Sequence, residues 1–497
     1  MRNHILLLLI LCLIPGKMIQ AQNKIQEVKG TFLVLAYQDE RNKYMYPMGF
    51  DNTDPQMWKA KIRELHKMGI EYVIFQQIAN DGKAFYPSKI MPRGYDTSRQ
   101  SPVDAVMEES SKLGMKVFMS IGWAKDQLDD LGKPETRARY MEILAELAGI
   151  YGKDKALYGW YLPVEACLGP VLPDFAVDAV NEFVQKVQSL TPGKKTMISP
   201  FGFYCSDFND PRYETSISRL KVDIIAYQDE VGCVREPMPI PNLRANWKKM
   251  REMHNKNGIQ LWANCESFTW EKGTNNWYSA LIPAAFPRFL SQLESASEAG
   301  VDCIISFSML GIYDDPASTY HLGQPYWSEK TYSDYMAWKN GDKYWDICAS
   351  AFLRELKNSA DTAMIQDSDK ALLDNKLAQE DFSDARWVKY DKGYHEVIID
   401  LHKETNVNKV FLRALNYHLK GIGMPVKIYL FTSNDGIKYS LSSIQDGPTF
   451  PNDNHDAWID GILFNNVNKE TRYIKVAFNC LQPAYIDEIF VNPQKIK

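Results

Sequence analysis

The sequence contains few of the residues and motifs on which metal and nucleophile chemistry usually depends. Its 497 residues include 8 His and 8 Cys, and no cysteines stand in a C-x-x-C pair or at the spacing of a zinc site. A Gly-rich phosphate loop, a G-x-S-x-G elbow and a dinucleotide-binding G-x-G-x-x-G are also absent. These absences argue against zinc hydrolases, P-loop phosphate chemistry and Ser-His-Asp hydrolysis.

Strong charge and long apolar runs are lacking as well. The net charge is −5 and no basic stripe appears, which argues against nucleic acid as a partner. The apolar run from Ile5 to Pro15 follows Arg2 and is too short to span a membrane. With the small residue Ala21 behind it, this segment is typical of a secretory signal peptide covering 1–21. We therefore expect an exported protein, periplasmic or extracellular, with no membrane span.

Cysteine is too sparse for a disulfide framework. Cys12 lies inside the predicted signal peptide, and the others are odd in number and without regular spacing. A single bridge, for example between Cys167 and Cys205, is compatible with an oxidising compartment.

From about residue 22 to 342 the sequence alternates between amphipathic helical segments and short apolar strands. Segments such as KMGIEYVIF and EAGVDCIISF place Gly after a helix, just before an apolar strand. The alternation predicts a parallel sheet, and eight repeats fit a (β/α)8 barrel, with an open doubly wound sheet as the alternative. The expected strands are 31–37, 70–77, 115–122, 156–164, 194–201, 222–228, 259–265 and 301–308, and the expected helices are 55–68, 102–113, 134–151, 173–190, 211–220, 241–256, 282–299 and 328–339.

Residues 343–497 have a different character. A mixed linker with a helical piece near 350–357 leads into strand-and-turn patterns such as HEVIIDL, VKIYLF and YIKVAF. No long amphipathic helix interrupts these strands, so this part is predicted to be a β-sandwich.

The β-rich part resembles the discoidin, or F5/8 type C, jelly roll of the galactose-binding-like superfamily. The resemblance rests on VIIDLHK, on MPVKIYLFTSNDGIKY, on RYIKVAF and on IDEIFV. It implies carbohydrate binding through exposed aromatics such as Tyr417 or Trp458. The alternative is a domain that only packs on the barrel.

The carboxyl ends of the barrel strands are expected to carry the active site, because they meet at one face of the fold. Strands four and seven each end in a glutamate, Glu165 and Glu266, and no histidine stands at a strand end. Along strand seven, Glu266 shares one face with Asn264 and Trp262. Two carboxyl groups on facing strand ends suit glycoside hydrolysis, where one donates a proton and the other attacks the sugar or activates water.

Further residues at these strand ends are predicted to bind the substrate. In the YQDEVG end of strand six, one of two acids is expected to contact sugar hydroxyls or to orient a catalytic Glu, unless both only cap the next segment. Aromatic rings at the strand ends can stack on sugars, although a single Trp more often packs its own loop. The strand-eight acids Asp314 and Asp315 are expected to be solvated or at the substrate rim. The predicted substrate contacts are Tyr37, Gln38, Trp123, Tyr204, Asp229, Glu230, Asn264 and Trp270.

The barrel resembles the large glycoside hydrolase superfamily whose acid/base Glu ends strand four and whose nucleophile Glu ends strand seven. The resemblance implies these roles for Glu165 and Glu266, with net retention. The chain departs from the superfamily motif at Val164, where Asn normally precedes the acid. More closely, WYLPVE and AYQDEVG are similar to a family of exported bacterial barrels of unknown function that occurs beside polysaccharide-degrading enzymes.

We therefore expect a secreted glycoside hydrolase that acts on a plant or host glycan, with an oligo- or polysaccharide as partner and no cofactor. The alternative is a non-catalytic glycan-binding protein on a hydrolase-like barrel, which Val164 favours. A third interpretation places a carboxylate-bound metal, such as a structural calcium, at strand six.

Overall fold

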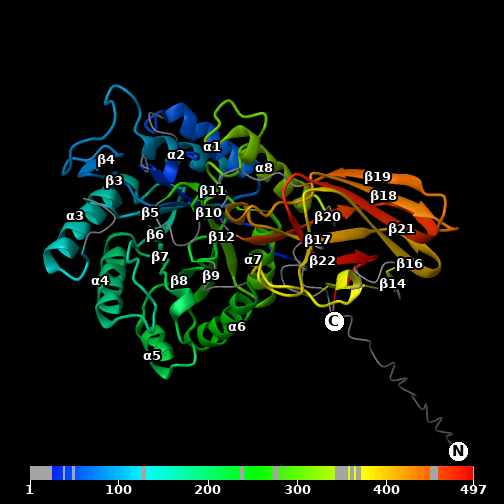
Figure 1. Cartoon of the computed structure of the whole chain (residues 1–497). Coiled ribbons are helices and arrows are strands. Elements are labelled where there is room, and N and C mark those ends of the chain that lie inside the picture. Colours follow the sequence, from blue (N-terminus) through cyan, green and yellow to red (C-terminus); the bar gives the residue numbers. More distant parts are fainter. Residues whose placement is uncertain are drawn as a thin grey trace, which may run out of the picture.

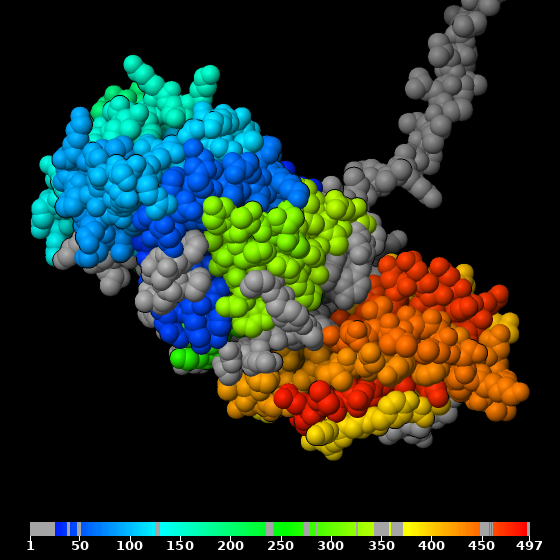
Figure 2. All heavy atoms as spheres, turned by 90° about the horizontal axis from the view of Figure 1, so that it is seen from above, coloured from blue at the N-terminus to red at the C-terminus, as the bar shows by residue number. Residues whose placement is uncertain are grey.

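The computed structural model describes residues 25–36, 40–46, 51–124, 130–234, 240–272, 279–284, 286–341, 356–358, 363–364, 371–447 and 457–495. These residues form two domains side by side, a barrel ringed by helices and a stack of antiparallel sheets (Figure 1). In the space-filling view the barrel, coloured blue to green, and the sheets, coloured orange to red, are separate lobes (Figure 2).

Eight parallel strands close the first domain into a barrel, which confirms the predicted fold class. The strands follow one another around the barrel in chain order, and the last pairs with the first. Each overlaps its predicted range. They are β1 (Gly30–Leu33), β2 (Tyr72–Phe75), β5 (Lys116–Ser120), β6 (Leu157–Tyr161), β7 (Lys195–Ile198), β8 (Ile224–Gln228), β9 (Gln260–Glu266) and β12 (Cys303–Phe307).

Local sequence signals determine where the helices begin and end. The side chains of Asp54 and Ser101 accept hydrogen bonds from the backbone at the starts of α1 and α2, with Pro at the first helical position. Gly114 ends α2 with a φ of 71°. The helices are α1 (Pro55–Lys67), α2 (Pro102–Leu113), α3 (Pro134–Tyr151), α4 (Asp174–Leu190), α5 (Pro211–Arg219), α6 (Ile240–Asn257), α7 (Phe286–Glu298) and α8 (Pro325–Lys339).

Side chains from all eight strands fill the interior of the barrel. Because side chains alternate along a strand, the next inward positions toward the carboxyl ends are Gln228 on β8 and Asn264 and Glu266 on β9. The apolar interior therefore ends in a polar layer at the carboxyl face. The interior residues are Phe32, Ile74, Phe118, Tyr161, Met197, Ile224, Ala226, Trp262, Cys303 and Ile305.

The second domain is a β-sandwich. A five-stranded sheet in the order β14-β16-β21-β18-β19 stacks on a four-stranded sheet in the order β15-β22-β17-β20, over a shared apolar core. The strands are β14 (Ala363–Met364), β15 (Val388–Tyr390), β16 (Gly393–Val407), β17 (Val410–Asn416), β18 (Lys427–Ser433), β19 (Ser440–Asp446), β20 (Trp458–Phe464), β21 (Lys469–Cys480) and β22 (Ala484–Val491).

One predicted element of the linker is wrong where it can be compared. The last two residues of the expected helical piece near 350–357 form a short strand, β13 (Leu356–Lys357), paired with β23 (Gln494–Lys495). The residues before them lie outside the described part of the chain. Within the described ranges, no helix combines the length and apolarity needed to cross a membrane.

The sandwich packs on the barrel through an apolar contact. Trp387, Leu415, Ile422 and Ile459 belong to the same buried cluster as the residues between the barrel strands and helices, and β20 contacts α7. Tyr417 packs against this cluster as well. Tyr417 was predicted as an example of an exposed sugar-contacting ring; the inter-domain contact partly buries it, and the sugar contact stays a prediction.

Candidate active site

The carboxyl ends of four neighbouring barrel strands are joined by polar side chains. Gln228, at the end of β8, donates through Nε2 to Glu165 Oε1 at 2.9 Å and to the backbone oxygen of Ser199 at 3.0 Å. Asn264 on β9 donates through Nδ2 to Ser199 Oγ at 3.1 Å. The network therefore links the segments that follow β6 and β7 to the ends of β8 and β9.

Glu266 is held in a cradle made by the turn after β8. Its Oε2 accepts hydrogen bonds from the backbone N–H groups of Gly232 and Cys233, both at 2.8 Å. A Cβ at Gly232 would lie 2.9 Å from that oxygen and 2.4 Å from the backbone oxygen of Phe268, so the close approach requires glycine. Only 3% of Glu266 is exposed. The cradle therefore fixes one carboxyl oxygen by two donors in a nearly dry site.

The charge state of Glu266 follows from this burial. Burial away from water raises the pKa of Glu266 to about 8, and repulsion from the carboxylates of Asp229 and Glu230 adds to this rise. The hydrogen bonds from Cys233 in the cradle lower the pKa and only partly offset it. Burial also raises the pKa of the Cys233 thiol well above its ordinary value, and the carboxylates of Glu266, Glu230 and Glu165 add to that rise. The Cys233 thiol therefore stays protonated at neutral pH beside the carboxyl group that its backbone N–H holds.

We expect the stability of the fold to depend on pH through Glu266. Its folded pKa of about 8 lies above the ordinary value of 4.5, so protonation favours the folded state. This contribution is present below pH 4.5 and is lost as the pH rises through about 8. Urea unfolding from about pH 5 to about pH 9 should therefore show a steeper loss for the wild type than for Glu266→Gln, which does not titrate. Parallel curves would contradict the raised pKa.

The side chain of Asp229 faces the helices outside the barrel and not the polar layer inside it. None of it is exposed. Its Oδ1 accepts from the backbone N–H of Glu266 at 3.1 Å, and its Oδ2 accepts from Gln292 on α7 at 2.7 Å. The prediction of a direct sugar contact is wrong for Asp229, because the side chain faces the helix layer. The alternative, that it orients Glu266, fits these contacts.

Glu230 also has a structural role, because it binds the backbone of the loop after β7. It takes a positive φ of 56°, and its Oε2 accepts from the backbone N–H groups of Gly202 and Phe203 at 2.9 and 2.5 Å. It thereby caps η2 (Phe203–Cys205), the short helix after β7. Burial raises the pKa of Glu230 to about 7. Its placement fits a cap and not the predicted substrate contact.

Comparison with known protein families assigns the barrel to one of them. Residues 28–320 match the family described as a domain of unknown function, DUF4434. The chain belongs to this family. A comparison with curated proteins gave no match.

Several solved structures that resemble the chain are described as glycosidases. One is a candidate α-L-fucosidase from Bacteroides thetaiotaomicron, with 21% identity and a TM-score of 0.51 over 66% of this chain and 97% of that one. A glycoside hydrolase family 5 structure from Bacteroides vulgatus has 11% identity and a TM-score of 0.37 over 86% of each chain. A glucosidase from Croceicoccus marinus has 9% identity and a TM-score of 0.37 over 92% and 96%. The first likeness shows a shared barrel fold, and the other two are too distant to support an argument.

The predicted aromatic contacts of the DUF4434 barrel lie in different surroundings. Trp123 packs with Val34 and Phe307 in a small cluster of its own. Trp270 is buried, and its Nε1 donates to the backbone oxygen of Cys233 at 3.2 Å, so it covers the cradle of Glu266. Tyr204 is half-buried on η2. Tyr37 and Gln38 lie outside the described residues.

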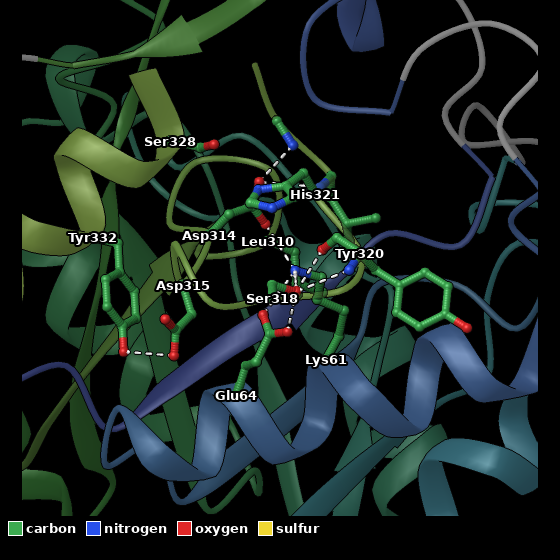
Figure 3. Close-up of polar contacts among 12 residues, drawn as sticks. Lys61, Glu64, Leu310, Asp314, Asp315, Ser318, Tyr320, His321, Ser328 and Tyr332 are labelled. Carbon is green, nitrogen blue, oxygen red and sulfur yellow. Dashed lines mark hydrogen bonds and ion pairs between the residues drawn. The ribbon is translucent and has the colours of Figure 1, made fainter. Parts of the chain in front are cut away.

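The strand-eight acids are not at a solvated rim. Asp314 is fully buried and accepts from Lys61 Nζ on α1 at 2.9 Å, while its other oxygen accepts from the backbone of Leu322 and Gly323 (Figure 3). Asp315 pairs with Lys67 of the same helix at 2.5 Å. Both acids therefore anchor the segment after β12 to α1.

Four residues of the site were not predicted: Ser199, Gln228, Gly232 and Cys233. Alternation along β8 makes Gln228 inward-facing once Ile224 and Ala226 are placed inside, so the strand pattern contained this signal. The other three depend on loop geometry that no local pattern encodes.

A metal was also predicted at strand six. Asp229 and Glu230 bind different partners, and the described part of the chain holds no group of three or more His, Cys, Asp or Glu side chains suited to an ion.

Proposed function

We propose that this DUF4434 protein is a retaining glycoside hydrolase that acts on an oligo- or polysaccharide. The observation that carries the proposal is the placement of two glutamates at the carboxyl face, Glu165 after β6 and Glu266 at the end of β9, with Gln228, Ser199 and Asn264 linking Glu165 to the strand that ends in Glu266. A carboxyl pair at the carboxyl face of a (β/α)8 barrel is the arrangement that glycoside hydrolysis requires.

In the proposed reaction, Glu165 protonates the leaving-group oxygen while Glu266 attacks the anomeric carbon. The covalent glycosyl intermediate is then hydrolysed by a water that Glu165 deprotonates, which gives net retention. The two backbone donors on Oε2 support the role of Glu266, because they favour its anionic form and fix its direction. Retention implies carboxyl groups about 5–5.5 Å apart with substrate bound.

A sugar hydroxyl also has a candidate acceptor in the polar layer. Asn264 Oδ1 is buried and has no hydrogen-bond partner among the described residues. A buried acceptor without a donor is costly, and a hydroxyl at this position would satisfy it. Asn264 thus retains its predicted role as a substrate contact in this proposal.

We expect activity to rise with pH through the titration of Glu266. Only the ionised carboxylate attacks, and a pKa of about 8 leaves about one tenth of it ionised at pH 7. On aryl glycosides whose leaving group is acidic enough to depart without protonation, kcat/KM reports the nucleophile alone and should climb about tenfold per pH unit up to about pH 8 and then level off. A profile that is flat or falls through the same pKa would remove Glu266 as the nucleophile.

The experiment that tests the function is a screen for sugar release. Purified protein is incubated with aryl glycosides and with plant and host polysaccharides, and the anomer of the first product is followed by NMR. Release of a sugar with retained configuration supports the proposal, and inverted product overturns the nucleophile role. Binding on a glycan array without release of sugar from any substrate would favour the non-catalytic alternative. Val164, which stands where the superfamily motif has Asn, also favours that alternative.

Export belongs to the same proposal. A soluble enzyme for polymeric glycans must meet its substrate outside the cytoplasm, and the apolar segment within 1–21 is typical of a signal peptide. The mass of the protein recovered from a periplasmic or culture fraction tests cleavage. A discoidin-like sugar site on the sandwich and a structural calcium remain predictions, and the same glycan array and a calcium titration of the unfolding midpoint test them.

A further inference from the structure

Two cysteines face each other between the loops that follow β6 and β7. The loops run side by side, because Cys167 forms a parallel bridge with Phe201, and Leu168 donates to the backbone oxygen of Phe201 at 2.8 Å. Cys205 lies on η2, one short turn further along the second loop. Each thiol therefore lies on the edge that faces the opposite loop.

Two glycines show how closely the thiols lie to the opposite loop. A Cβ at Gly169, on the loop of Cys167, would lie 2.4 Å from Cys205 Sγ. A Cβ at Gly202, on the loop of Cys205, would lie 2.8 Å from Cys167 Sγ and 3.3 Å from the backbone nitrogen of Gly169. Both sulfur atoms thus lie between the two loops, where Cys205 Sγ donates to the backbone oxygen of Gly202 at 3.4 Å and Cys167 Sγ accepts from the backbone N–H of Gly169 at 3.4 Å.

We propose that Cys167 and Cys205 form a disulfide that joins the loops after β6 and β7. The oxidant is a small-molecule or protein disulfide, such as oxidised glutathione. One thiolate attacks it to give a mixed disulfide, and the second cysteine then displaces the other half. One S–S bond breaks and one forms, and the two cysteine protons end on the two thiols of the reduced reagent.

The bond would strengthen the wall of the site. Cys167 follows Glu165 by two residues, and η2 supplies the backbone donors that hold Glu230. A link between them fixes the loop that carries the proposed proton donor to the loop that Glu230 caps. The bridge needs an oxidising compartment, which the proposed export provides, but its formation in vitro does not depend on any enzymatic activity.

The bridge is structural and not an exchange catalyst. Catalytic cysteines have lowered pKa values, whereas burial and the neighbouring Cys167 raise the pKa of Cys205 to about 11. Cys205 is nevertheless exposed, so an oxidant can reach the pair. The other cysteines within the described residues are Cys233, Cys265, Cys303 and Cys480, of which the last three are buried.

The test oxidises the purified full chain with glutathione, alkylates the remaining thiols under denaturing conditions and maps the peptides by mass spectrometry. A peptide that joins Cys167 to Cys205 supports the proposal. Alkylation of both residues, a glutathione adduct on Cys205, or its pairing with another cysteine overturns it.

A second measurement compares the unfolding midpoint of the oxidised and reduced protein. Closing the loop from 167 to 205 should raise the midpoint by about 5 °C, mainly by restricting the unfolded chain. The shift should vanish in Cys205→Ser, which changes an exposed residue, and persist in Cys480→Ala, which changes a cysteine of the sandwich. An equal shift in Cys205→Ser would also overturn the proposal.

Discussion

Glu266→Gln should abolish turnover while leaving the protein folded. Glutamine keeps the shape of the side chain, and its carbonyl oxygen can still accept from Gly232 and Cys233. It cannot form the glycosyl ester, so kcat should fall by about 10³-fold or more. Folding should be unharmed, because the substitution removes a carboxyl group whose charge is costly to bury. The measurement is kcat on the best substrate from the screen, beside the urea midpoint at neutral pH.

A matched control separates chemistry from burial. Glu109 on α2 is also buried and pairs with Arg63 at 2.9 Å, remote from the strand ends. Glu109→Gln is the same chemical change and should leave kcat within about twofold, since it touches no group of the site. Wild-type turnover in Glu266→Gln, or equal losses in both variants, would remove Glu266 from the mechanism.

The barrel could be predicted because its signals are local. A helix that ends in Gly before an apolar strand specifies one repeat without reference to the rest of the chain. The bounds predicted for 102–113 and 134–151 match α2 and α3. The predictions failed where a short strand forms only because it pairs with another segment of the chain. The start of the helix expected at 282–299 is instead β11 (Leu281–Pro283), which pairs with β10 (Phe268–Trp270).

The site was only partly predictable, and strand six shows why. The same alternation that placed Asn264 and Glu266 inside the barrel places Gln228 inside and Asp229 outside. The prediction favoured the charged residues of YQDE, although the neutral Gln228 holds Glu165. The role of Glu230 depends on a positive φ and on donors from a different loop, and no pattern within the strand encodes either.

Lys61→Met should destabilise the protein by about 3–5 kcal/mol, because it leaves a buried carboxylate without its cation. Only 1% of the Lys61 side chain is exposed, and its Nζ contacts Asp314 at 2.9 Å and Glu64 at 2.7 Å (Figure 3). Asp314 also binds the backbone after β12, so the loss should loosen the segment beside the end of β9. Urea unfolding measures the change in the free energy of unfolding.

The adjacent pair on the same helix is the control for this prediction. Lys67 and Asp315 have the same chemistry, but 62% of the Lys67 side chain is exposed. Lys67→Met should therefore cost far less than Lys61→Met, since water already screens the pair. Adding Asp314→Asn to Lys61→Met should recover part of the loss, because Asn removes the unpaired charge and still accepts from Leu322 and Gly323. Equal losses for Lys61→Met and Lys67→Met would show that burial of the pair does not determine its contribution.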